Sequence, residues 1–266
     1  MREEKELMEL GRRKIGELVA VVGVVLGFIA LWVSALEGSS EKYADDGTVL
    51  AAGIIILGLA ACCLAASLLL GKVNLDLTAA VAGAAAFGFF LYQPALVSFK
   101  YIDKLSWGSW LGICAGLIPL GAGAAHLWHR RPDAKAPGVT LWTVAAAIGL
   151  VLIVIGVWSK VVDNFNISYW KASASGHALG LLLLLLVIVS AILIAVAVNT
   201  RKAELADLAL IVSGILVGLA IAEGVHDALG SNNNMGTGAW LELAGGVVLL
   251  LALIGSRVLK LAELKK

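Results

Sequence analysis

Long stretches without a charged side chain constrain the fold of this chain more than any other feature. The longest is Ala172–Thr200, which runs for 29 residues without Asp, Glu, Lys or Arg and includes six consecutive leucines at Leu181–Leu186. An α-helix needs about 20 apolar residues to cross the hydrocarbon core of a bilayer. Because lipid offers no hydrogen bonds to the backbone, an uninterrupted transmembrane helix is the expected structure.

The same criterion predicts eight membrane spans along the chain. The two shortest charge-free runs, Leu208–Ala222 and Leu243–Ser256, reach full length only when each is extended across one acidic residue, Glu223 or Glu242. The connections are short, and Arg201–Asp207 is predicted to be a tight turn. We therefore expect an all-α, polytopic integral membrane protein with eight transmembrane helices, the other spans being Leu18–Leu36, Thr48–Gly71, Leu77–Phe99, Leu105–Trp128 and Ala136–Ser159.

The composition of the chain excludes several classes of soluble protein. Apolar residues make up 60% of the sequence and charged residues 15%, and the mean hydropathy is +0.94. Soluble globular chains carry roughly 45–50% apolar and about 25% charged residues. The polar residues are too few to coat a soluble particle, which argues against a cytosolic enzyme, a nucleic-acid binder and a disordered protein. The expected partners are the lipid bilayer and other membrane proteins or further copies of this chain.

The distribution of basic residues predicts the orientation in the membrane. Of the 20 Lys and Arg residues, 15 fall in segments on the same side as the N-terminus and five on the opposite side. Cytoplasmic segments of membrane proteins carry the excess of Lys and Arg. We therefore expect both termini in the cytoplasm and a location in the plasma (cytoplasmic) membrane.

The two halves of the sequence resemble each other. Gly108-Ser-Trp-Leu matches Gly238-Ala-Trp-Leu, and Gly116 matches Gly246 at the same distance of 130 residues. Four helices per half is an even number, so the halves share one orientation and form a parallel 4+4 repeat, an arrangement also found in transporters. The predicted division is an amphipathic, cytoplasmic N-terminal segment at 1–14, a first repeat at 15–128, a cytoplasmic linker at 129–138 and a second repeat at 139–266.

Small residues recur at the spacing that brings helices together. Gly108, Gly112 and Gly116 lie on one face of the fourth predicted span, and Gly214 and Gly218 do so on the seventh. Small residues let helix backbones approach closely in a membrane. These glycine zippers are expected to pack helices within the chain, or alternatively between copies of it.

Most tryptophans fall at the predicted outer ends of the spans. Trp32, Trp110, Trp158 and Trp240 represent this group. Indole rings prefer the level of the lipid headgroups, so an aromatic belt is the simplest interpretation. The alternative is a docking surface for a partner.

One cluster of ionisable residues lies at the outer ends of the last three spans. Glu223, His226 and Asp227 share a face of the seventh span, Glu242 is expected to point into the bundle, and His177 begins the sixth span on the same side. Ionisable residues within membrane helices are candidate functional groups. Carboxylates with imidazoles suit proton exchange, a cation, or a transition-metal ion. The alternative is an ordinary polar helix end at the headgroup level.

The sequence therefore leaves three functions open. No nucleotide-binding loop, zinc-protease motif or nucleophile–base pattern occurs, so no catalytic residue and no cofactor is expected. The first hypothesis is a non-enzymatic membrane scaffold or accessory subunit of a membrane complex. The second is a small channel or transporter for protons, cations or a small solute that uses the polar cluster. The third is a metal-dependent membrane enzyme with an ion bound at that cluster.

Overall fold

The computed structural model describes residues 18–33, 47–70, 75–92, 95, 105–129, 138–159, 168, 179–229 and 236–263. Apart from turns and an isolated bridge residue at Leu105, the structure in these ranges is helical. A helix at Leu18–Ala30 comes first. It is followed by α2 (Gly47–Leu70), α3 (Leu75–Phe90), α5 (Trp107–His129), α6 (Leu141–Trp158), α8 (Leu179–Thr200), α9 (Ala203–Leu229) and α10 (Thr237–Glu263).

Five of the described helices are long and apolar enough to cross a membrane. These candidate spans lie in α5, α6, α8, α9 and α10. Shorter apolar stretches of helix lie at Leu18–Ala30 in the first helix, at Leu50–Cys62 within α2 and at Leu77–Phe90 within α3. The described part of the protein is thus built from helices, and its long apolar helices are those of a membrane protein.

Two predicted boundaries are wrong. The turn expected at Arg201–Asp207 comprises only Arg201 and Lys202, because α9 already begins at Ala203. Ala, Glu and Leu favour helix, and the carboxylate of Glu204 in the first turn interacts favourably with the helix dipole. Charged residues therefore extend α9 beyond its charge-free run.

The span predicted from Ala136 also starts later than expected, at Leu141. Thr140 has extended backbone angles and caps α6, because its side-chain oxygen accepts a hydrogen bond of 3.2 Å from the backbone N–H of Thr143. The Thr143 hydroxyl in turn accepts one of 3.3 Å from the N–H of Thr140. Such reciprocal capping defines a helix start that the apolar pattern alone does not reveal.

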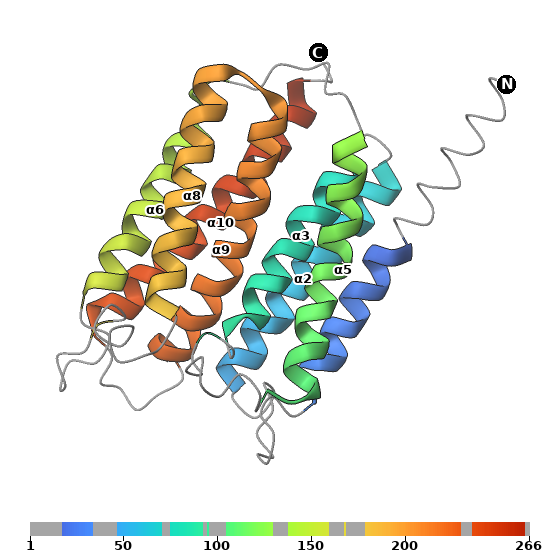
Figure 1. Cartoon of the computed structure of the whole chain (residues 1–266), viewed down its shortest axis with the longest axis vertical. Coiled ribbons are helices and arrows are strands. Elements are labelled where there is room, and N and C mark those ends of the chain that lie inside the picture. Colours follow the sequence, from blue (N-terminus) through green and yellow to red (C-terminus); the bar gives the residue numbers. More distant parts are fainter. Residues whose placement is uncertain are drawn as a thin grey trace, which may run out of the picture.

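The helices form two groups that lie side by side (Figure 1). The first group contains the Leu18–Ala30 helix, α2, α3 and α5, and the second contains α6, α8, α9 and α10. Within the groups, the α3–α5 and α6–α10 interfaces are the most extensive. Between the groups, α3 and α9 form the main interface, and α2 also contacts α9.

The α3–α9 interface is held together by close contact between backbones, and we call it the central seam. A Cβ atom on Gly88 of α3 would collide with the carbonyl group of Ile215 in α9. A Cβ on Gly218 of α9 would collide with the carbonyl oxygen of Ala85 in α3 and would lie 2.7 Å from the backbone nitrogen of Phe89. Only glycine allows the two helices to approach this closely.

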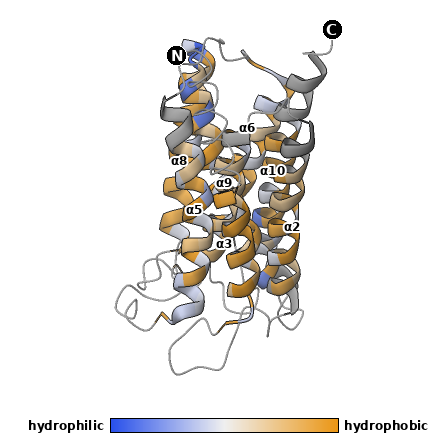
Figure 2. Ribbon diagram, turned by 90° about the vertical axis from the view of Figure 1, so that its right-hand side faces the viewer, coloured by the Kyte–Doolittle hydropathy of each residue, from blue (hydrophilic) through white to orange (hydrophobic). Residues whose placement is uncertain are grey.

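Helices differ strongly in how much of their surface the protein covers. The candidate span of α9 is 61% buried inside the chain, whereas that of α8 is 28% buried. The exposed side chains of α8 are large and apolar, including Leu181, Leu185 and Ile192. The hydropathy colouring shows apolar residues along the helices of the bundle (Figure 2). Helix α9 is therefore central, and α8 presents Leu181 and Leu185 outward.

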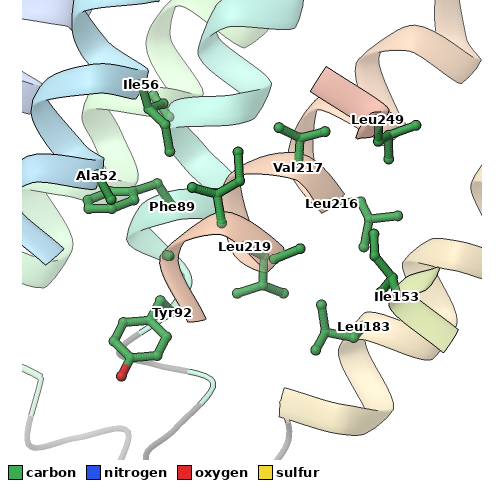
Figure 3. Packing of buried hydrophobic residues seen from close by; sticks show 14 of the residues in the cluster. Ala52, Ile56, Phe89, Tyr92, Ile153, Leu183, Leu216, Val217, Leu219 and Leu249 are labelled. Atoms are coloured by element: carbon green, nitrogen blue, oxygen red, sulfur yellow. The ribbon is translucent and has the colours of Figure 1, made fainter. Parts of the chain in front are cut away.

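The apolar core continues from one group into the other. Phe89 of α3, Tyr92 just after α3, Leu219 of α9 and Ile153 of α6 belong to a single buried cluster (Figure 3). The rings of Phe89 and Phe90 also meet edge to face, with centroids 5.1 Å apart. This continuity means that the two groups share one core.

Candidate functional site

Two glutamates lie completely inside the helical bundle. The side chain of Glu223 on α9 is 1% exposed, and that of Glu242 on α10 is 0% exposed. Each of them interacts with other residues of the chain. A carboxylate in such surroundings must be protonated, paired or bound to a cation, because an uncompensated buried charge costs several kcal/mol.

The contacts of neighbouring residues show that the two glutamates lie at the same level of the bundle. A Cβ on Gly224 of α9 would lie 2.8 Å from both the Cα and the Cβ atoms of Leu243 on α10. One turn away, a Cβ on Gly246 of α10 would lie 3.1 Å from the side chain of Ile221 on α9. The sequence neighbours of Glu223 and Glu242 are thus in direct contact, because glycine lets α9 and α10 approach closely.

Glu242 also packs against α6. A Cβ on Gly156 would lie 2.9 Å from the backbone nitrogen of Glu242 and 3.1 Å from its Cβ atom. The start of the Glu242 side chain therefore occupies space that Gly156 leaves free. The tight fit fixes where this carboxylate leaves the backbone of α10.

His226 connects the site to the first group of helices. Its ring lies one turn after Glu223 on α9, and its centroid is 5.3 Å from that of the buried Tyr92 ring at the end of α3, with the ring planes inclined by 48°. This contact crosses between the two groups. Aromatic rings at this separation and inclination attract each other weakly.

The remaining members of the predicted cluster are only partly described. Asp227 belongs to α9, but its side chain lies outside the described part of the structure, as does the whole of His177. Among the described residues, no three His, Cys, Asp or Glu side chains form a group that could hold a metal ion. Glu223, His226 and Glu242 do not make up such a group by themselves.

Tyr92 is a site residue that the sequence did not single out. In the charge-free run Leu77–Phe99 it is one of few polar side chains, and it is fully buried. Its neighbourhood with His226 depends on the packing of α3 against α9, which the sequence pattern does not encode. A tyrosine within an apolar run was the available signal, because a buried hydroxyl needs a polar neighbour.

Four of the five predicted packing glycines lie against another helix of this chain. Gly112 and Gly116 of α5 face Phe90 and Phe87 of α3, and Gly214 of α9 faces Val81 and Ala84 of α3. Gly218 belongs to the central seam. Gly108, at the start of α5, is buried and its backbone N–H donates a hydrogen bond of 3.4 Å to the Ser106 hydroxyl.

The four tryptophans proposed as interface aromatics are all exposed on the surface of the bundle. Trp110 and Trp240 lie in the first turns of α5 and α10, Trp158 ends α6, and Trp32 follows the Leu18–Ala30 helix. Each has roughly half of its surface uncovered by the chain. They are therefore available to lipid or to another protein.

Comparison of the chain with protein-family models, with curated proteins and with solved structures finds no match.

Proposed function

We propose that this protein is a non-enzymatic integral membrane protein that acts as a rigid scaffold or an accessory subunit of a membrane complex. The observation that carries the proposal is the central seam. Gly88 and Gly218 bring the backbones of α3 and α9 into direct contact at two successive turns. Close-packed interiors have low compressibility, so the two groups are expected to move as one body.

A transporter that alternates between two open states needs its halves to rock against each other around a site near the midplane. The central seam opposes such rocking, because sliding α3 and α9 along each other would drive backbone atoms into backbone atoms. The exposed tryptophans offer the surface that an accessory subunit requires, since Trp is enriched at the energetically important centres of protein interfaces.

Spin-label distances can test whether the groups move as one body. One label replaces Leu117 on α5 and the other replaces Ile192 on α8; both side chains are exposed, and the helices belong to different groups. A single narrow distance distribution in lipid, unchanged by a proton gradient, is expected. The pair Val151 and Ile192, within the second group, serves as the control. Two distances for the first pair and one for the control would contradict the scaffold function.

The accessory role predicts a partner that depends on the tryptophans. After mild solubilisation of native-level protein, a stoichiometric partner should be retained by the wild type and lost from a Trp110→Leu/Trp240→Leu variant. The Leu185→Ala variant on the exposed face of α8 is the control and should retain it. A partner that survives the double tryptophan change would argue against this docking surface.

We further propose that the chain crosses the membrane eight times as a parallel 4+4 repeat, with both termini in the cytoplasm of the cell. Two equivalent contacts support the repeat. A Cβ on Gly23 would lie 2.8 Å from the carbonyl oxygen of Ala115, and one on Gly149, 126 positions later, would lie 2.9 Å from that of Gly245. Ala115 and Gly245 are themselves 130 positions apart, so the first and fourth helices of each half meet at matching residues.

The buried carboxylates favour a second candidate function, the movement of protons or cations. Glu223 and Glu242 lie at one level of the α9–α10 pair and are removed from lipid. Intramembrane acids that face a bundle interior often mark ion or proton pathways. In this case the scaffold would enclose a conducting or exchanging site.

Flux into liposomes tests this second function. The variants Glu223→Gln and Glu242→Gln keep the shape of the side chain and remove the charge, so they should abolish flux if the carboxylates carry it. Glu204→Gln, at the exposed start of α9, is the matched control. Wild-type liposomes without proton or cation flux, or flux unaffected by both site changes, would count against this function.

A further inference from the structure

The end of the bundle opposite the two buried glutamates carries an arginine in an unusual place. Helix α8 ends at Thr200, and Arg201 follows with φ of 56°, the left-handed conformation that closes many helices. Its backbone N–H donates a hydrogen bond of 2.9 Å to the carbonyl oxygen of Ala197. Glycine is the residue usually found in this conformation, because a side chain strains it. An arginine here suggests that the guanidinium group has a use that offsets the strain.

The guanidinium group is directed at the beginning of α6. A Cβ atom on Gly138 would lie 2.5, 2.7 and 2.8 Å from the Nη2, Cζ and Nη1 atoms of Arg201. The flat face of the group therefore rests on the bare backbone of Gly138, two residues before the α6 cap Thr140. Any larger residue at position 138 would displace it.

The surroundings of this group are suited to an anion. Among the described residues, none forms an ion pair with Arg201, and Arg201 and its neighbour Lys202 are both exposed. The N-terminus of α6 adds the partial positive charge of its helix dipole. A guanidinium group recognises phosphate through two parallel N–H donors.

The neighbouring apolar side chains identify the source of the phosphate. Val139 and Leu141, on either side of the α6 cap, are 73% and 74% exposed. Such side chains offer nothing to a dissolved ion, but they match the acyl chains below a lipid headgroup. The sequence places this end of the bundle at the cytoplasmic face, and the cytoplasmic leaflet holds the anionic lipids.

We infer that Arg201, resting on Gly138, binds the phosphate group of an anionic phospholipid at the α6–α8 end of the bundle. The lipid would lie between the start of α6 and the α8–α9 turn. Lys202 contributes general attraction to the anionic surface rather than a specific contact.

Lipid binding to the purified full-length protein tests this inference. Native mass spectrometry in mild detergent gives the affinities for phosphatidylglycerol and phosphatidylcholine. Loss of a charge-assisted hydrogen-bond pair should weaken phosphatidylglycerol binding about tenfold or more in Arg201→Gln. Phosphatidylcholine binding should not change.

Two further variants distinguish a specific binding site at Arg201 from general electrostatic attraction to the lipid. Gly138→Ala keeps every charge but displaces the guanidinium group, so it should also weaken phosphatidylglycerol binding. Lys202→Gln removes one charge beside the site and should have a distinctly smaller effect than Arg201→Gln. Equal effects at positions 201 and 202, with no effect of Gly138→Ala, would overturn the inference.

The source of the phosphate is tested in the same experiment. Millimolar inorganic phosphate or glycerol phosphate should leave the phosphatidylglycerol adduct in place, because neither reaches the apolar flank at Val139 and Leu141. Displacement of the lipid by these soluble anions would refute a lipid site. Arg201→Lys, which keeps the charge and loses the paired donors, provides the readout if the glutamine variant does not fold.

Discussion

Replacing Gly218 by alanine should weaken the central seam by an amount that the structure allows to be worked out. The added Cβ would collide with the carbonyl oxygen of Ala85 and lie 2.7 Å from the backbone nitrogen of Phe89, whereas ordinary contacts begin at 3.4 Å. The contact with Phe89 alone requires α3 to retreat by about 0.7 Å, and the closer contact with Ala85 requires a larger shift. Both obstructing atoms belong to the backbone, so no side-chain rotation relieves the contact.

Helix α3 has no free space on its other side. A Cβ on Gly83 would lie 2.9 Å from the carbonyl oxygen of Gly116 and 2.9 Å from the ring of Pro119, both in α5. A shift of α3 away from α9 thus closes the equally tight α3–α5 interface. Overpacking of a well-packed core costs about 1–3 kcal/mol, and the upper part of this range is expected here.

Gly58→Ala on α2 is the matched control. No atom lies within 4 Å of a Cβ at this position, so the same chemical change meets open space. Both variants gain about 1 kcal/mol of helix propensity, and this gain cancels when they are compared. The remaining difference of about 2–3 kcal/mol corresponds to roughly 4–12 °C between their unfolding temperatures.

Tryptophan fluorescence during heating in mild detergent measures the unfolding temperatures of the two variants and the wild type. Gly218→Ala should unfold below Gly58→Ala by the stated margin. If the two variants unfold at the same temperature, α3 and α9 are not in direct backbone contact. The central seam would then not make the two groups of helices a rigid scaffold.

Three further predictions follow from other contacts. Thr140→Ala removes the α6 cap and should cost about 1 kcal/mol of stability, whereas Thr200→Ala, whose exposed hydroxyl donates to the Val196 carbonyl, should change the unfolding temperature by less. Phe89→Ala empties a fully buried position and should cost about 3–5 kcal/mol, while Ile192→Ala on the exposed face of α8 should be close to neutral in the same thermal assay. Fluorescent protein fused to either terminus should fluoresce, because both termini are expected in the cytoplasm; a dark fusion at one end would contradict an even number of spans.

The apolar pattern predicted helix bounds well where the charge-free run and the helix end at the same residues. The span expected at Thr48–Gly71 is observed as α2 at Gly47–Leu70, because polar residues flank the run directly. At α9 the pattern failed, since Ala203 to Asp207 are helical although they include two acids. A charge-free run indicates which residues can lie in lipid. The ends of a helix also depend on helix propensity and on capping residues such as Thr140.

The sequence predicted some residues of the candidate site but not others. Glu223 and Glu242 stood out because acids are rare in apolar runs, and a single helix explains why Glu223 and His226 share a face. Tyr92 was not predicted as their neighbour, because it follows α3 and its contact with His226 on α9 joins residues that are 134 positions apart. Such a contact follows from how glycines let these two helices approach, and no short-range pattern contains that information.

The central seam also has a consequence for the order of synthesis. Gly88 is translated 127 residues before Ile215, its contact in α9, and at about 5–20 residues per second this gap lasts roughly 6–25 s. During that interval the small-residue face of α3 lacks the helix that finally covers it. A nascent chain stalled before α9 should therefore pair through α3 with another unfinished copy, and the arrival of α9 should release the pair.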